Sequence, residues 1–256
     1  MVISHDFDWV QLFVDIVYLT LMTALTSAFA AILGQGGGLL LMGILAGFVP
    51  APALIAVHAV VQASSNGSRA YLAHKHINWP VILPVAVGIV LGASLILPFI
   101  PLLNWQRMQA VIALYILWLT WGHLLNLPKS PTTDIKSGLP FIKLGFLQGS
   151  LGMALGATGP LGNALLLSKG LNKESIVASN AVIMLLSHLI KIIFFSVMGV
   201  QLLNHAQLLL FLCIAATAGS FVGNYFRKKI PENIFFPVFK GLLTLLAIRM
   251  FLLAFY

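Results

Sequence analysis

The chain has 256 residues, of which 60% are apolar and only 8% are charged. Soluble domains carry about a quarter charged residues, so this composition and a mean hydropathy of +1.01 exclude a soluble enzyme. The net charge of +8 comes from basic residues between apolar segments, which indicates membrane topology rather than a nucleic-acid partner. The sequence therefore predicts an all-α integral membrane protein.

Helical segments are expected along both halves of the chain. In the first half they are Trp9–Leu33, Leu39–Gly47, Pro52–Leu72, Trp79–Phe99 and Trp105–Leu125. In the second half they are Phe141–Leu155, Pro160–Ser168, Lys173–Met198, His205–Phe226 and Asn233–Tyr256. The second segment of each half has about nine residues and reaches about 14 Å, too short for a hydrocarbon core of about 30 Å. We predict half-helices or re-entrant pieces there, and about eight to ten membrane segments overall.

The second half of the chain repeats the first. When Leu33-Gly-Gln-Gly-Gly-Gly38 is aligned with Leu155-Gly-Ala-Thr-Gly-Pro160, the polar residues of two later helices coincide. His58 falls on Asn180, Ser65 on Ser187, Asn66 on His188, and Arg69 on Lys191. We therefore predict a first repeat at residues 1–127, a cytoplasmic linker at 128–138 and a second repeat at 139–256. Each repeat would hold a glycine-broken helix pair and three transmembrane helices.

The basic residues predict that the two repeats are inverted. Cytoplasmic loops attract Lys and Arg, which assigns to that side the clusters Arg69 to His76, Lys129 to Lys143, Lys169 to Lys173, and Arg227 to Lys229. Arg107 is an exception in an otherwise uncharged outer loop. The loop after the Arg69 helix is then inside, the loop after the Lys191 helix is outside, and both termini are outside. Inverted repeats are a recurrent plan of secondary transporters, which bind substrate near the midplane.

The two glycine breaks form the first candidate binding site. Glycine leaves backbone N–H groups uncovered, and a helix that begins after the break points its positive dipole end at the gap. Two such ends at equivalent depth would form a cradle for an anion. The alternative is that the glycines only permit close helix crossing. The candidate ligands at the breaks are Gln35, Gly36, Gly37, Gly38, Thr158, Gly159 and Asn163.

A polar stripe in each half forms the second candidate site. One helix face carries His58, Gln62, Ser65, Asn66 and Arg69, and its counterpart carries Asn180, Met184, Ser187, His188 and Lys191. Polar groups inside a bilayer usually face a cavity or a partner. We therefore take as further candidate ligands Asn66, Arg69, Ser187 and Lys191. Histidine titrates near neutral pH, so His58 and His188 are candidates for proton coupling. The alternatives are snorkelling cations and structural histidines.

Several chemistries lack the residues that they need. The chain has no His-Glu-x-x-His motif, its only cysteine is Cys213, and the acids in predicted spans, Asp15 and Glu174, lie near the ends of those spans. We therefore expect no metal, no cofactor and no enzymatic activity. An electropositive midplane without carboxylates favours an anionic substrate.

The order and doubling of these motifs resemble the TauE/SafE sulfite exporter family, also called the 4-toluene sulfonate uptake permease family. The resemblance covers nearly the whole chain and rests on Gly34–Leu41, Ser64–His74, Asn78–Pro80, Gly88–Ala93, Ala218–Gly223 and a last helix with Lys240 and Arg249. It implies a carrier of sulfite or an organosulfur anion in the inner membrane of a bacterium or archaeon. The second glycine motif departs from the family's glycine-rich form, because it reads Ala157-Thr-Gly-Pro-Leu-Gly162. Thr158 and Asn163 could therefore bring side-chain donors to this half of the site.

We therefore expect a secondary transporter that exports a small anion, either sulfite or a short organosulfonate, with proton coupling as an open possibility. The first alternative is a passive anion channel, and the second is a membrane subunit that does not transport. The expected partners are the anion and the lipid bilayer, and a homodimer is a further option. The particular sulfur anion, the coupling ion and the direction of transport stay open at this point.

Overall fold

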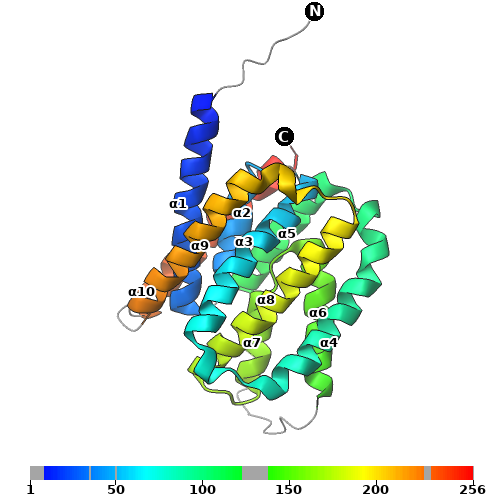
Figure 1. Cartoon of the computed structure of the whole chain (residues 1–256), viewed down its shortest axis with the longest axis vertical. Coiled ribbons are helices and arrows are strands. Elements are labelled where there is room, and N and C mark those ends of the chain that lie inside the picture. Colours follow the sequence, from blue (N-terminus) through cyan, green and yellow to red (C-terminus); the bar gives the residue numbers. More distant parts are fainter. Residues whose placement is uncertain (1–8, 35, 50, 123–137, 228–231, 256) are drawn as a thin grey trace, which may run out of the picture.

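The computed structural model describes residues 9–34, 36–49, 51–122, 138–227 and 232–255, and these form ten α-helices and no strand. The first half contains α1 (Trp9–Leu33), α2 (Gly37–Leu45), α3 (Ala51–Leu72), α4 (Trp79–Ile96) and α5 (Trp105–Trp121). The second half contains α6 (Leu139–Leu155), α7 (Gly159–Ser168), α8 (Lys173–Val197), α9 (Ala206–Phe226) and α10 (Glu232–Leu253). Figure 1 shows them as one bundle, above which the N-terminal part of α1 rises.

Every predicted helical segment overlaps one observed helix, and the two short segments are confirmed as short helices. α2 has nine residues and is almost entirely buried, and α7 has ten residues. Gln35 and residues 128–137 of the predicted linker lie outside the described residues.

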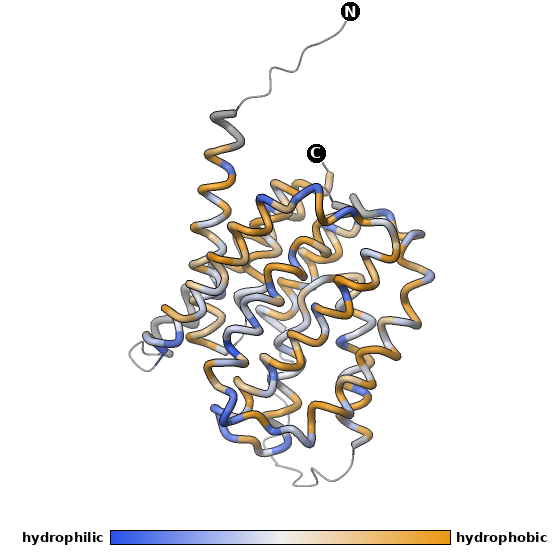
Figure 2. Tube along the Cα trace, in the orientation of Figure 1, coloured by the Kyte–Doolittle hydropathy of each residue, from blue (hydrophilic) through white to orange (hydrophobic). Residues whose placement is uncertain are grey.

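The outside of the bundle is apolar, and polar residues are enclosed within it. Four stretches are long and apolar enough to cross a membrane: Phe13–Leu33, Trp79–Leu102, Lys173–Val197 and Leu202–Phe226. Large apolar side chains such as Leu83, Leu95 and Ile214 are exposed, whereas His58 and Asn66 are buried. Figure 2 shows the apolar colouring along most of the helices. This is the distribution of an integral membrane protein, as predicted, because hydrocarbon rather than water surrounds it.

The two halves make matching helix crossings. α1 packs along α9, and α6 packs along α4, while α3 and α8 pack on each other. Gly219 of α9 lies against the carbonyl of Ala24, and Gly92 of α4 lies against the carbonyl of Phe146. Under the alignment of the two glycine breaks, Ala24 falls on Phe146. The same close backbone contact therefore occurs at equivalent places in both halves.

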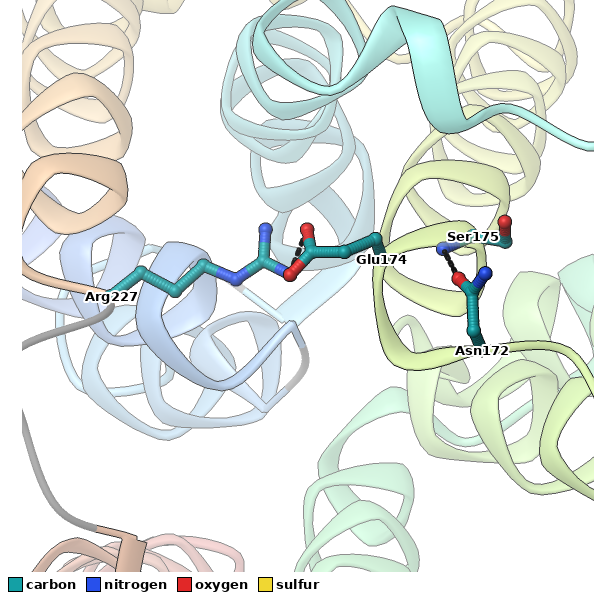
Figure 3. A network of polar contacts seen from close by, with 4 residues as sticks. All are labelled: Asn172, Glu174, Ser175 and Arg227. Atoms are coloured by element: carbon teal, nitrogen blue, oxygen red, sulfur yellow. Dashed lines mark hydrogen bonds and ion pairs between the residues drawn. The ribbon is translucent and has the colours of Figure 1, made fainter.

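Figure 3 shows how the beginning of α8 is fixed at one end of the bundle. The Asn172 side chain accepts a hydrogen bond from the Ser175 N–H at 2.9 Å and caps α8. Glu174, in the first turn, forms an ion pair of 2.7 Å with Arg227 at the end of α9. A carboxylate is favourable at a helix N-terminus, so the pair stabilises α8 and ties it to α9.

Replacing Glu174 with Gln should have a small effect. The carboxylate is 45% exposed, and such pairs contribute about 0–1 kcal/mol. We expect the free energy of unfolding in detergent to fall by less than about 1 kcal/mol, and the loss to shrink at high salt. A larger loss, or one that salt does not change, would show that Arg227 depends on Glu174 for more than a surface contact.

Candidate functional site

A small cavity lies where the two short helices begin, between α3 and α8. Its volume is about 30 Å³, room for two or three water-sized groups of roughly 10–15 Å³ each. The first half contributes the predicted site residues Gly36, Gly38, His58, Asn66 and Arg69, and the second half contributes Thr158, Gly159 and His188. The structure thus brings together residues of both glycine breaks and of both polar stripes.

The other predicted site residues that the structure describes do not line this cavity. Gly37 is packed against the Thr26 carbonyl of α1, and Asn163 lies on α7. Ser187 and Lys191 are both buried, and their polar ends lie close to Gly152 of α6. Gln35 is outside the described residues.

Glycine is required where the helices break. Gly34 and Gly36 have φ angles of 76° and 88°, and Gly156 has a φ of 82°. Residues other than glycine rarely adopt this left-handed backbone conformation. The turns end α1 and α6 and let α2 and α7 start anew, so the first N–H groups of both short helices lack intrahelical partners. Both short helices begin at the cavity wall, and the positive ends of their dipoles lie there.

His58 and Asn180, at equivalent positions of the two halves, each contact a carbonyl near the start of the short helix. His58 Nε2 lies 2.9 Å from the Gly38 carbonyl in the first turn of α2. Asn180 Nδ2 donates to the Gly159 carbonyl at the start of α7 at 3.2 Å. Each contact ties a long helix to the short helix of its own half.

Buried cations lie at the C-terminal ends of the broken helices. Arg69 Nη1 donates to the Ala30 carbonyl in the last turn of α1 at 3.2 Å, and Nη2 donates to Asn66 Oδ1. Lys191 Nζ donates to the carbonyl of Gly156, which caps α6, at 2.6 Å. The side chains are 7% and 2% exposed, so neither snorkels to the surface. A cation offsets the negative dipole end of a helix.

Several buried polar atoms around the cavity have no hydrogen-bond partner among the described residues. The donors are Gln62 Nε2 and Arg69 Nε, and the Thr158 hydroxyl can donate or accept. His58, His188 and Asn180 add unpaired ring nitrogens and an amide oxygen. Each such group costs about 1–3 kcal/mol when it stays unpaired. The cavity is therefore suited to a polar occupant.

Three residues at or beside the cavity were not among the predicted site residues: Gln62, Asn180 and Gln148. Gln62 and Asn180 belong to the predicted polar stripes, but only the structure places them on the cavity wall. Gln148 is fully buried on α6 and donates to the Thr158 carbonyl at 3.4 Å. Its signal was a lone amide in an apolar helix. Among the described residues, no three His, Cys, Asp or Glu side chains gather to hold a metal ion.

Comparison with known proteins identifies the family. A family model described as sulfite exporter TauE/SafE matches residues 19–250, a range that includes both glycine breaks and the whole cavity. No curated protein and no solved structure gave a match. The family is one of membrane transporters of sulfur anions. With nine-tenths of its length matched and its motifs in order, the chain belongs to the TauE/SafE sulfite exporter family.

Proposed function

We propose that this protein is a secondary transporter that exports a small sulfur oxyanion, either sulfite or a short organosulfonate, from the cytoplasm. The observation that carries the proposal is a buried cavity with unpaired donors, Gln62 Nε2 and Arg69 Nε. No acidic side chain lines this cavity in the part of the chain that the structure describes. Such a site attracts an anion and repels a cation.

The broken helices add to the preference for an anion. An anion in the cavity would be attracted by the starts of α2 and α7 and repelled by the ends of α1 and α6. Arg69 and Lys191 donate to carbonyls at those two ends. Their charges therefore offset the repulsive contribution and leave the attractive one. On this proposal, Arg69 also binds the anion directly, whereas Lys191 acts through the end of α6.

Transport requires access to the cavity from both sides in turn. We propose that the two halves are inverted repeats around it, with both termini outside, the linker in the cytoplasm, and the chain in the inner membrane. The matching crossings of α1 with α9 and of α6 with α4 support this. So do the opposite directions of α3 and α8 in Figure 1, where α3 descends and α8 ascends. Relative movement of such halves is a common transport mechanism.

Sulfite flux in proteoliposomes tests the proposal. Saturable uptake of labelled sulfite should be accelerated by unlabelled sulfite on the opposite side, because a carrier exchanges substrate. Sulfate, taurine and sulfoacetate as competitors would define the range of anions. A passive channel would carry current without this acceleration. Absence of any sulfur-anion flux would overturn the proposed substrate.

A further inference from the structure

The unpaired acceptors of the cavity carry information about the substrate that the cations do not. The nitrogen of His58 that faces the Gly38 carbonyl must carry a hydrogen, because a carbonyl oxygen can only accept. In the neutral ring, Nδ1 is then a bare acceptor, and it is buried without a partner among the described residues. The histidine has therefore used its one donor on the protein backbone.

The equivalent residue of the second half is in the same condition. The Asn180 atom that faces the Gly159 carbonyl must be the amide nitrogen, for the same reason. Its Oδ1 is thereby identified as the other atom, which is buried against Gly162 and has no partner among the described residues. His58 and Asn180 both line the cavity. Each half thus has one unpaired acceptor on a residue that lines the cavity, and the unpaired donors Gln62 Nε2 and Arg69 Nε belong to residues of the same wall.

A cavity with both unpaired donors and unpaired acceptors fits poorly with an anion that carries no hydrogen. Such an anion satisfies the donors, but its oxygens would face the lone pairs of His58 and Asn180, which would stay unpaired. An anion with one O–H group satisfies the donors and also one of these acceptors, His58 Nδ1. Resting on the proposed function, we infer that the site selects a singly charged oxyanion that retains one hydrogen, hydrogen sulfite rather than the sulfite dianion.

The consequence concerns how protons take part in transport. Each hydrogen sulfite ion carries one proton across the membrane within its own O–H bond, so its transport equals that of one sulfite dianion with one proton. No side chain then has to gain and lose a proton in each cycle. His58 binds the substrate's hydrogen and does not carry it. Proton linkage becomes a property of the substrate.

A matched pair of anions tests this inference. Chlorate is pyramidal, has three oxygens and one negative charge like hydrogen sulfite, and has no hydrogen. We would measure the binding of both ions to the purified full-length protein in neutral detergent by calorimetry, below the second ionisation of sulfurous acid. One unpaired acceptor corresponds to roughly tenfold in affinity, so hydrogen sulfite should bind at least about tenfold more tightly than chlorate. Above that ionisation, the affinity for total sulfite should fall with the hydrogen sulfite fraction.

Chlorate also serves as the control for titration of the protein, because it does not itself ionise over this range. Ionisable side chains on α3 and on the helices packed against it include Arg69 on α3, His188 and Lys191 on α8, and Cys213 on α9, and α2 has none. If one of them changed its charge, chlorate binding would change with pH as well. A pH dependence confined to sulfite identifies the ligand as the group that titrates.

Two substitutions of His58 separate an acceptor from a proton carrier. Gln offers an amide nitrogen and an amide oxygen but cannot titrate, so His58→Gln should keep the preference for hydrogen sulfite over chlorate. His58→Leu should lose most of this preference, and continued chlorate binding would show that the variant is folded. If His58→Gln abolishes the pH dependence of sulfite binding, the histidine itself titrates and the inference is wrong.

The outcomes also separate this inference from the proposed function. Equal affinities for chlorate and hydrogen sulfite would overturn the selection for a hydrogen but leave an anion transporter. Tighter binding of total sulfite above the ionisation would identify the dianion as the ligand and likewise overturn it. If neither anion binds and no sulfite flux is found, the proposed function fails together with the inference.

Discussion

Replacing Lys191 with Met should lower the affinity for the transported anion by about tenfold, because a buried charge at a helix end contributes about 1–2 kcal/mol. Lys191 Nζ donates to the Gly156 carbonyl at 2.6 Å. Met fills a similar volume but leaves this carbonyl unpaired and the negative end of α6 uncompensated. Since Lys191 does not line the cavity, the loss should appear as a raised KM for sulfite flux in proteoliposomes, with the protein still folded.

The matched control for this experiment is Lys143→Met. Lys143 lies on α6 itself, and its side chain is exposed, so its removal changes the net charge equally without touching the helix end. Its flux should equal that of the unchanged protein. Normal flux in Lys191→Met would remove Lys191 from any role in anion binding. A fall in both variants would indicate a general effect of net charge.

Replacing Gly92 with Leu should destabilise the fold by on the order of 3 kcal/mol, because the side chain would overpack a backbone contact. A Cβ at Gly92 would collide with the Phe146 carbonyl, and no flexible side chain lies there to give way. The crossing of α4 and α6 would have to open. We expect a lower thermal midpoint in detergent and a smaller monodisperse fraction in size-exclusion chromatography.

Gly241→Leu provides the control, because it makes the same chemical change in α10. Nothing lies within 4 Å of a Cβ at that position, so only the helix propensity changes, in the stabilising direction. We expect an unchanged or slightly raised midpoint. If both variants were equally stable, the glycines of α4 would not be needed for close packing.

The fold was largely predictable because membrane helices are long apolar runs with few rivals. The charge-free runs and the glycine breaks gave the helices within a few residues, since an interruption of left-handed glycines leaves a helix no way to continue. The capping side chains Asn104 and Asn172 refine the ends of α5 and α8. Such details depend on individual hydrogen bonds rather than on hydropathy.

The candidate site was predictable in outline but not in its contacts. Helical periodicity places His58, Asn66 and Arg69 on one face, and the structure puts all three on the cavity wall. Lys191 shares a face with His188 but reaches across to α6 instead. The flexible four-carbon side chain of lysine can reach either the cavity or α6, so helical periodicity alone does not predict which of the two Lys191 contacts. The alignment of the halves predicts equivalence of position, but the donors and acceptors of each residue emerge only from their contacts.

The glycine crossings bear on how the protein can move. In α1 with α9 and in α4 with α6, backbone meets backbone, as at Gly219 on Ala24 and Gly92 on Phe146. At these glycines no side chain separates the two helices, so sliding would drive carbonyl oxygens into Cα atoms. Each pair should therefore move as one rigid unit. Relative movement is then expected at the interface between α3 and α8, which borders the cavity where the anion would bind. Opening one side of this interface would close the other.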